Sequence, residues 1–280
     1  MTLTLLLTLV FGVVVGFTIG LTGGGGSIFA IPALTYGLGL PTHEAIGVSL
    51  MSVGATALIG AIQRLWRREV EVPTGLLFAG MGMVGAPLGT MINRMLPDAL
   101  LLVAFAVLMV LISVHMWRRA SGPPADATPV LEPLNSPPDD TGAHCRRSPD
   151  GRLLLTSRCG MLLASLGFGT GILSGLFGVG GGFVIVPALV LFAGLGIKRA
   201  VATSLLVISM ISTSGVASYL IAGRPLNLEV SSLFAAGGVV GLILGTLLGR
   251  KLSGPTLQKS FSVAILGVAC FILIKHLLGI

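Results

Sequence analysis

Long stretches of the chain contain hydrophobic residues and no charged residue. These uncharged stretches run over residues 1–42, 45–63, 72–93, 99–117, 159–197, 200–223, 230–249 and 260–274. A membrane-spanning helix needs about 20 apolar residues, so the two longest stretches hold two segments each. The pattern predicts an all-α, polytopic membrane protein with about five helical segments on each side of a polar interval.

The polar interval covers residues 118–158. It holds 7 of the 15 prolines and 11 of the 27 charged residues. Such a composition cannot bury enough apolar surface to fold. We therefore divide the chain into a first transmembrane repeat (1–117), a polar, proline-rich linker (118–158) and a second transmembrane repeat (159–280).

The two halves resemble each other in sequence. At a shift of 155 positions, 16 of the 49 ungapped positions from Gly12 to Gly60 carry the same residue in the second half. Glycines spaced by four recur in both halves, at 12, 16 and 20 and at 167, 171 and 175. Such glycines suit close helix–helix packing in lipid. The agreement indicates an internal duplication.

The positions of the basic residues favour inverted repeats. If the short segments 27–40 and 182–195 cross the membrane, 14 of the 17 Lys and Arg residues lie on the linker side. If both segments are re-entrant, the split is 11 to 6. Because basic residues gather on the cytoplasmic side, we predict ten crossings. The linker is then cytoplasmic and both termini lie outside, while the re-entrant alternative stays open.

Composition and charge exclude several other classes of protein. The net charge is +7, but the basic residues punctuate apolar runs and form no stripe with aromatic residues, so we expect no nucleic-acid partner. Cys145, Cys159 and Cys270 show neither a disulfide framework nor metal-ligand spacing, so we expect no metal and no cofactor. The N-terminal run lacks preceding basic residues and a cleavage site, and we interpret it as a first span.

Two clusters of consecutive glycines are the candidate substrate site. They lie in GLTGGGGSIFAIPAL (20–34) and GLFGVGGGFVIVPAL (175–189). Each glycine costs a helix roughly 1 kcal/mol relative to Ala, so the helices should break there. The N-terminus of a following half-helix binds anions, and paired broken helices are typical of secondary-transporter sites. The predicted binding residues are Gly23, Gly24, Gly25, Gly26, Ser27, Gly178, Gly180, Gly181 and Gly182, with Pro32 and Pro187 as hinges.

Hydroxyl groups are the second source of candidate ligands. Ser49 and Ser204 match across the repeat and, with Thr203, can donate hydrogen bonds to an oxyanion without burying a charge. The alternative is that each only bonds a carbonyl one turn back in its helix. The segment interiors contain essentially no ionisable residue, so no proton relay is built in. His43 and Glu44 lie at a segment end, as loop charges or, alternatively, in a gating or proton-coupling role.

The motif GxxxGLxGxGGG, then Pro-Ala-Leu and A-x-x-T-S-L, occurs at 171–189 and 200–205. It resembles the sulfite exporter TauE/SafE family, also called the toluene-sulfonate uptake permease family. The first half carries a degraded copy, with Ser27 at the last glycine and Val48 where the second half has Thr203. The resemblance implies a transporter in the inner (plasma) membrane, not an enzyme, for small sulfur-containing anions such as sulfite or organosulfonates.

We expect transport by alternating access at the glycine breaks, with the lipid bilayer and the anion as partners. Whether the chain forms a homo-oligomer is left open. The alternative is an intramembrane enzyme or a non-transporting scaffold, although the spans offer only hydroxyls where catalysis needs a nucleophile–base pair or carboxylates.

Overall fold

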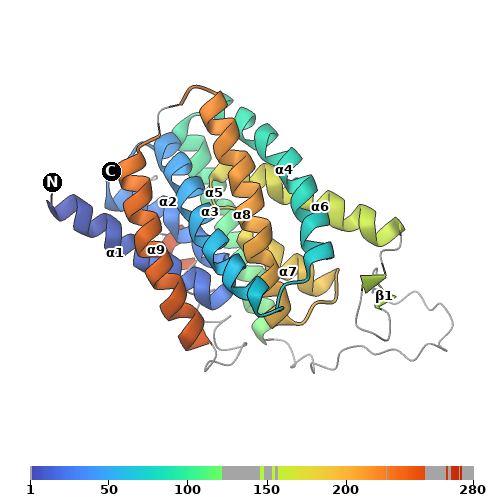
Figure 1. Ribbon diagram of the computed structural model, residues 1–280. Coiled ribbons are helices and arrows are strands. Elements are labelled where there is room, and N and C mark those ends of the chain that lie inside the picture. Colours follow the sequence, from blue (N-terminus) through green and yellow to red (C-terminus); the bar gives the residue numbers. More distant parts are fainter. Residues whose placement is uncertain are drawn as a thin grey trace.

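A computed structural model describes residues 2–121, 146–147, 153–154, 157–224, 226–249, 263, 266–270 and 272. Figure 1 shows a bundle of helices with α3 and α8 in its middle. The first half contains α1 (Thr2–Thr22), η1 (Gly25–Phe29), α2 (Ala30–Pro32), η2 (Ala33–Gly37), α3 (Thr42–Trp66), α4 (Val72–Met95) and α5 (Asp98–Ser121). The second half contains α6 (Ser157–Phe177), α7 (Gly182–Leu191), α8 (Ile197–Ile221) and α9 (Leu228–Gly249).

Within the described residues, six helices are long and apolar enough to cross a membrane: α1, α3, α4, α6, α8 and α9. A bilayer core leaves no water to pair exposed backbone groups, which a helix satisfies internally. The predicted fold class, an all-α polytopic membrane protein, is confirmed. The linker contributes one small hairpin, in which β1 (Arg146–Arg147) pairs with β2 (Leu153–Leu154). The division of the chain into two repeats and a linker stays a prediction.

The glycines spaced by four bring helix backbones together. A Cβ atom added to Gly12 in α1 would collide with the Phe234 carbonyl oxygen in α9. One added to Gly167 in α6 would collide in the same way with the Phe78 carbonyl oxygen in α4. Only a residue without a side chain permits such an approach. The predicted packing role of these glycines is confirmed, and α1 packs on α9 as α6 packs on α4.

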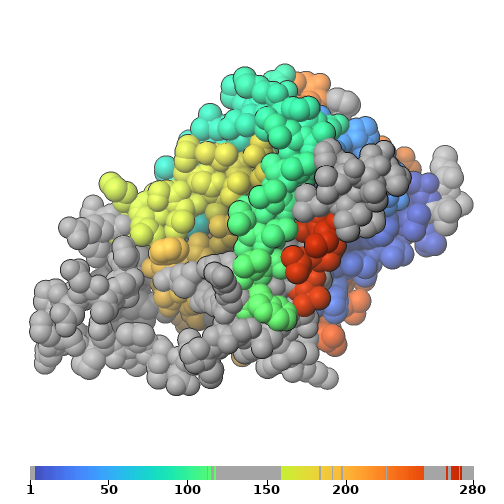
Figure 2. Space-filling view, turned by 180° about the vertical axis from the view of Figure 1, so that it is seen from behind, coloured from blue at the N-terminus to red at the C-terminus, as the bar shows by residue number. Residues whose placement is uncertain are grey.

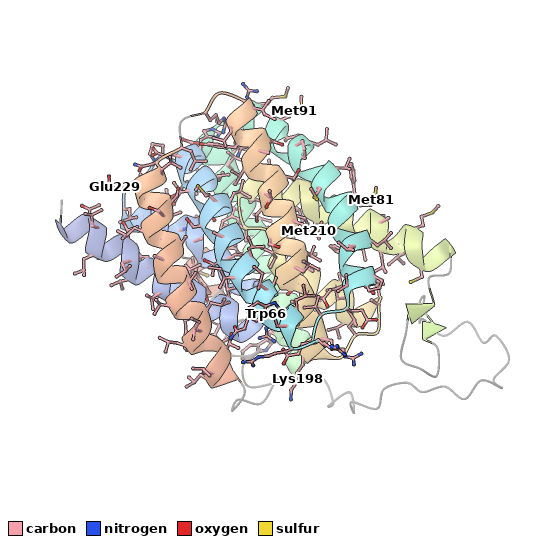
Figure 3. The ribbon with its side chains drawn as sticks, viewed as in Figure 1. Trp66, Met81, Met91, Lys198, Met210 and Glu229 are labelled. Atoms are coloured by element: carbon pink, nitrogen blue, oxygen red, sulfur yellow. The ribbon has the colours of Figure 1, made fainter. Side chains whose placement is uncertain are left out.

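The central helices α3 and α8 run antiparallel. At one end the Tyr219 hydroxyl of α8 donates a hydrogen bond to the His43 carbonyl of α3, at 3.0 Å. At the other end the Glu71 N–H, just after α3, donates to the Thr203 hydroxyl at 3.0 Å. Figure 3 places Trp66 and Lys198 together at this second end, and Glu229 at the opposite end of the bundle. The start of each central helix thus lies beside the end of the other.

The rear of the bundle contains α5 and the described residues near the C-terminus. Figure 2 shows the two side by side. Phe105 and Met109 of α5 belong to one buried apolar cluster with Ala269 and Ile272. Val179, which lies in the second glycine break, belongs to the same cluster. This layer covers one side of the candidate site.

One cysteine expectation is wrong. Cys159, in the first turn of α6, is disulfide-bonded, whereas Cys270 is free. The sequence showed no recurrent cysteine framework, and spacing alone cannot reveal an isolated pair that folding brings together.

Candidate functional site: two glycine breaks in contact

Both glycine clusters interrupt the helical chain. The first break lies between α1 and η1, and the second lies between α6 and α7. Gly23 and Gly24 have φ angles of 76° and 121°, while Gly178, Gly180 and Gly181 have angles of 67°, 69° and 69°. Side-chain-bearing residues rarely adopt these values, whereas glycine adopts them freely. The predicted helix breaks are confirmed.

The two breaks touch each other in the middle of the bundle. A Cβ atom on Gly24 would lie 2.9 Å from the Cα atom of Gly182, and one on Gly182 would lie 2.7 Å from the Cα atom of Gly24. The side chain of Ile208, midway along α8, packs against both glycines. Gly180 also lies against Ile208 and against Val53 of α3. The structure therefore brings Gly24, Gly180 and Gly182 together between the two central helices.

Each break is held by the central helix of the opposite half. Gly23 packs on Val201 in the first turns of α8, and Gly178 packs on Ile46 in the first turns of α3. The Ser49 hydroxyl of α3 donates to the Gly178 carbonyl at 2.6 Å. The Ser204 hydroxyl of α8 donates to the Gly23 carbonyl. The matched serines thus satisfy backbone carbonyls that the breaks leave without a helical partner.

This geometry bears on the proposed ligand role of the two serines. A hydroxyl carries a single proton to donate. In this arrangement Ser49 and Ser204 donate that proton to carbonyls in the opposite half, beyond their own helices. The alternative of bonding only one turn back does not describe Ser49, and it describes Ser204 only in part, because that hydroxyl also reaches the Val201 carbonyl at 2.9 Å. Direct anion binding by either serine stays a prediction.

Other predicted residues face elsewhere. Gly26 packs on Thr18 and Ile19 of α1. A Cβ atom added to Gly181 would lie 3.1 Å from the Thr170 carbonyl oxygen of α6. Gly25 is buried within η1. Thr203 accepts the Glu71 N–H, and its methyl group faces Gly75 in α4. The structure places Thr203 at the start of α4 and away from the glycine contact.

The segments after the two breaks differ. After the first break the chain forms the short 3-10 helix η1, the single turn α2 and the π-helix η2. The Ser27 hydroxyl, in η1, donates to the Gly24 carbonyl at 2.7 Å. After the second break the chain forms one α-helix of 10 residues, α7, whose left-handed N-cap Gly181 has no side-chain cap. Pro32 ends α2 and Pro187 lies inside α7, where it removes one backbone donor. Their hinge role stays a prediction.

Sequence reasoning missed Ser212 in α8. Its side chain is fully buried, and its hydroxyl has no hydrogen-bond partner among the described residues. A Cβ atom on Gly180 would lie 3.3 Å from this hydroxyl oxygen. The matching position in the first half is Ala57. Nothing in the sequence separates Ser212 from the other serines of α8, because packing decides whether a hydroxyl finds an acceptor.

A polar cluster lies at the end of the bundle where α3 begins. Arg224 donates to the Asn93 side-chain oxygen at 2.9 Å, and His43 Nδ1 lies 2.9 Å from the same oxygen. His43 Nε2 lies 3.1 Å from Asp98. The Asn93 amide donates to the Leu176 carbonyl at 2.8 Å, two residues before Gly178. His43 is thus linked through Asn93 to the chain just before the second break. A gating role for His43 stays a prediction. Within the described part of the chain, no three His, Cys, Asp or Glu side chains are placed to hold a metal ion.

Comparison with known proteins gives matches over nearly the whole chain. A family model described as "Sulfite exporter TauE/SafE" matches residues 8–272. A "Probable membrane transporter protein" of Xylella fastidiosa is 32% identical over 277 residues, covering 96% of this chain and 95% of the relative. The "Probable membrane transporter protein YunE" of Bacillus subtilis is 26% identical, covering 96% and 97%. No solved structure matches the chain.

Proposed function

Because the chain belongs to the sulfite exporter TauE/SafE family of membrane transporters, which are not enzymes, we propose that it carries a small sulfur-containing anion across the inner membrane. Sulfite and organosulfonates are the proposed substrates, and alternating access around the paired glycine breaks is the proposed mechanism. The observation that carries this proposal is the direct contact of Gly24 with Gly182 midway along the central helices.

The chemistry at the glycine contact suits an anion that is held without a buried cation. Helix α7 begins at Gly182, beside the first break. The first backbone N–H groups of a helix have no partner within it, and the helix dipole adds positive potential at that end. A phosphate-like or sulfonate-like group is a suitable acceptor for such donors. Discontinuous helices use this arrangement in secondary transporters.

The proposed mechanism needs two inverted repeats, and paired contacts support them. Gly12 with Phe234 matches Gly167 with Phe78, and Ser49 with Gly178 matches Ser204 with Gly23. Each contact therefore occurs twice, and the two halves exchange roles between the two copies. Such exchange is expected when two similar halves rock against each other around a central site.

We place the linker in the cytoplasm on the distribution of basic residues. The disulfide at Cys159 favours a linker outside the cytoplasm, because disulfides are rare in the reducing cytosol. Labelling of single cysteines from the two sides of the membrane decides between them. We expect a cysteine at Arg94 to react only from outside and one in the linker only from inside. Reaction of both from the same side would contradict the ten-crossing arrangement.

The test of transport is uptake of labelled sulfite into vesicles containing the purified protein. We expect saturable sulfite uptake that unlabelled sulfonates inhibit and chloride does not. Absence of saturable uptake and of binding for every sulfur anion tried would overturn the substrate assignment.

A matched pair of variants tests the glycine contact itself. Gly182 does not have a positive φ, so Gly182→Ala adds only a methyl group, 2.7 Å from the Gly24 Cα atom. Overpacking costs about 1–3 kcal/mol, and we expect uptake to fall by about tenfold or more. Gly169→Ala in α6 is the control, since a Cβ there meets nothing within 4 Å. Equal uptake by both variants would remove the contact from the mechanism.

A further inference from the structure

One buried hydrogen-bond donor beside the second glycine break is unused. The Ser212 side chain has no exposed surface, and its hydroxyl finds no acceptor among the described residues. Leaving a buried hydroxyl unpaired destabilises a protein, so buried hydroxyls are normally paired. A donor kept in this state at a candidate binding site points to an acceptor that arrives from outside the chain.

The position of Ser212 links it to the start of α7. Ser212 follows Ile208 by one helical turn on the same face of α8, and Ile208 packs on Gly24, Gly180 and Gly182. The Ser212 hydroxyl oxygen lies 3.3 Å from a Cβ placed on Gly180 and 3.5 Å from one placed on Gly54. It therefore faces the last residues before α7, whose N-cap Gly181 lacks a side-chain cap.

Three other serines around the breaks already have acceptors, whereas Ser174, one turn before Gly178 in α6, also has a buried hydroxyl without a partner among the described residues. Ser27 donates to the Gly24 carbonyl, Ser49 to the Gly178 carbonyl and Ser204 to the Gly23 carbonyl. The first half has Ala57 at the position of Ser212. The Ser212 hydroxyl thus has no counterpart at the matching position of the first half.

We propose that the Ser212 hydroxyl donates a hydrogen bond to an oxygen of the bound anion at the N-terminus of α7. This inference rests on the proposed function and assigns the oxyanion to the second break. Backbone N–H groups at the start of α7 and the hydroxyl of α8 then hold the same group from two elements. Different oxygens of one sulfite or sulfonate group can accept from both donors at once.

The experiment combines sulfite affinity with stability in the absence of anion. Ser212→Ala removes a donor that serves an anionic acceptor, and we expect the Kd for sulfite and the KM for uptake to rise about 10- to 100-fold. The same substitution removes an unpaired hydroxyl, so the anion-free Tm should stay equal or rise. A serine with only a structural role would show a lower Tm and an unchanged Kd.

Two further variants make the result decisive. Ser209→Ala is the control, because its hydroxyl, on the same helix, already donates to the Leu206 carbonyl at 2.8 Å. It should leave the Kd for sulfite unchanged. Ser212→Cys keeps a side chain of similar size with a weaker hydrogen-bond donor, and it should give an intermediate Kd for sulfite. It replaces the alanine variant in this test if Ser212→Ala does not fold. Wild-type Kd in Ser212→Ala and Ser212→Cys would overturn this inference, while sulfite uptake by the wild type would leave the proposed function standing.

Discussion

The two glycine breaks occupy matching places in the bundle and are built differently. The first leads into three short elements, a 3-10 helix, one α-turn and a π-helix, whereas the second leads into a single α-helix. The 3-10 geometry gives poorer hydrogen bonds than the α-helix, and π segments are rare and frequent at functional sites. A shared set of long-range contacts therefore does not require the same local helix. We expect the first segment to be the more deformable of the two.

Two sequence differences account for the unequal chemistry of the breaks. Ser27 stands where the second half has Gly182, and its hydroxyl is used within the first break, on the Gly24 carbonyl. Ala57 stands where the second half has Ser212, which has an unused hydroxyl. At these matched positions the first half uses its hydroxyl within the break, whereas the second half has a hydroxyl that is free to bind a ligand. In the proposed mechanism, the second break is therefore the one that binds the anion.

The largest expected effect tests what the breaks have in common. Gly23→Ala and Gly178→Ala each place a side chain at positive φ and against the Cα atom of Val201 or Ile46. The φ angle costs roughly 1–2 kcal/mol and the overpacking about 1–3 kcal/mol. We expect both variants to lose several kcal/mol of unfolding free energy, seen as a large drop in the Tm of the detergent-solubilised protein.

Gly80→Ala in α4 provides the control for these two variants, since a Cβ there meets nothing within 4 Å. It should be neutral or slightly stabilising, because Ala favours a helix over Gly by up to about 1 kcal/mol. If Gly23→Ala were as harmless as Gly80→Ala while Gly178→Ala was not, the tight packing would belong to the second break alone.

The sequence predicted the helical membrane fold and both breaks because these follow from local patterns. Apolar runs specify membrane-spanning segments, and consecutive glycines interrupt a helix because each one destabilises it relative to Ala. The acceptors of Ser49 and Ser204 were not predictable, since each carbonyl lies in the opposite half of the chain. Ser212 was missed for a related reason, because the lack of an acceptor for its hydroxyl follows from packing and not from the local sequence. Long-range partners depend on packing, which periodicity does not encode.

A smaller effect tests whether the breaks are held in the same way. Ser49→Ala leaves the Gly178 carbonyl without this donor, and Ser204→Ala does the same to the Gly23 carbonyl. A buried polar group left unpaired costs about 1–3 kcal/mol, so we expect similar, moderate decreases in Tm for both variants. Ser165→Ala is the control, because that exposed hydroxyl bonds only the Leu162 carbonyl of its own helix, and its Tm should be unchanged. A Tm decrease confined to Ser49→Ala would show that Ser27 is enough to stabilise the first break. A Tm decrease confined to Ser204→Ala would show that the Asn93 bond to Leu176 is enough to stabilise the second break.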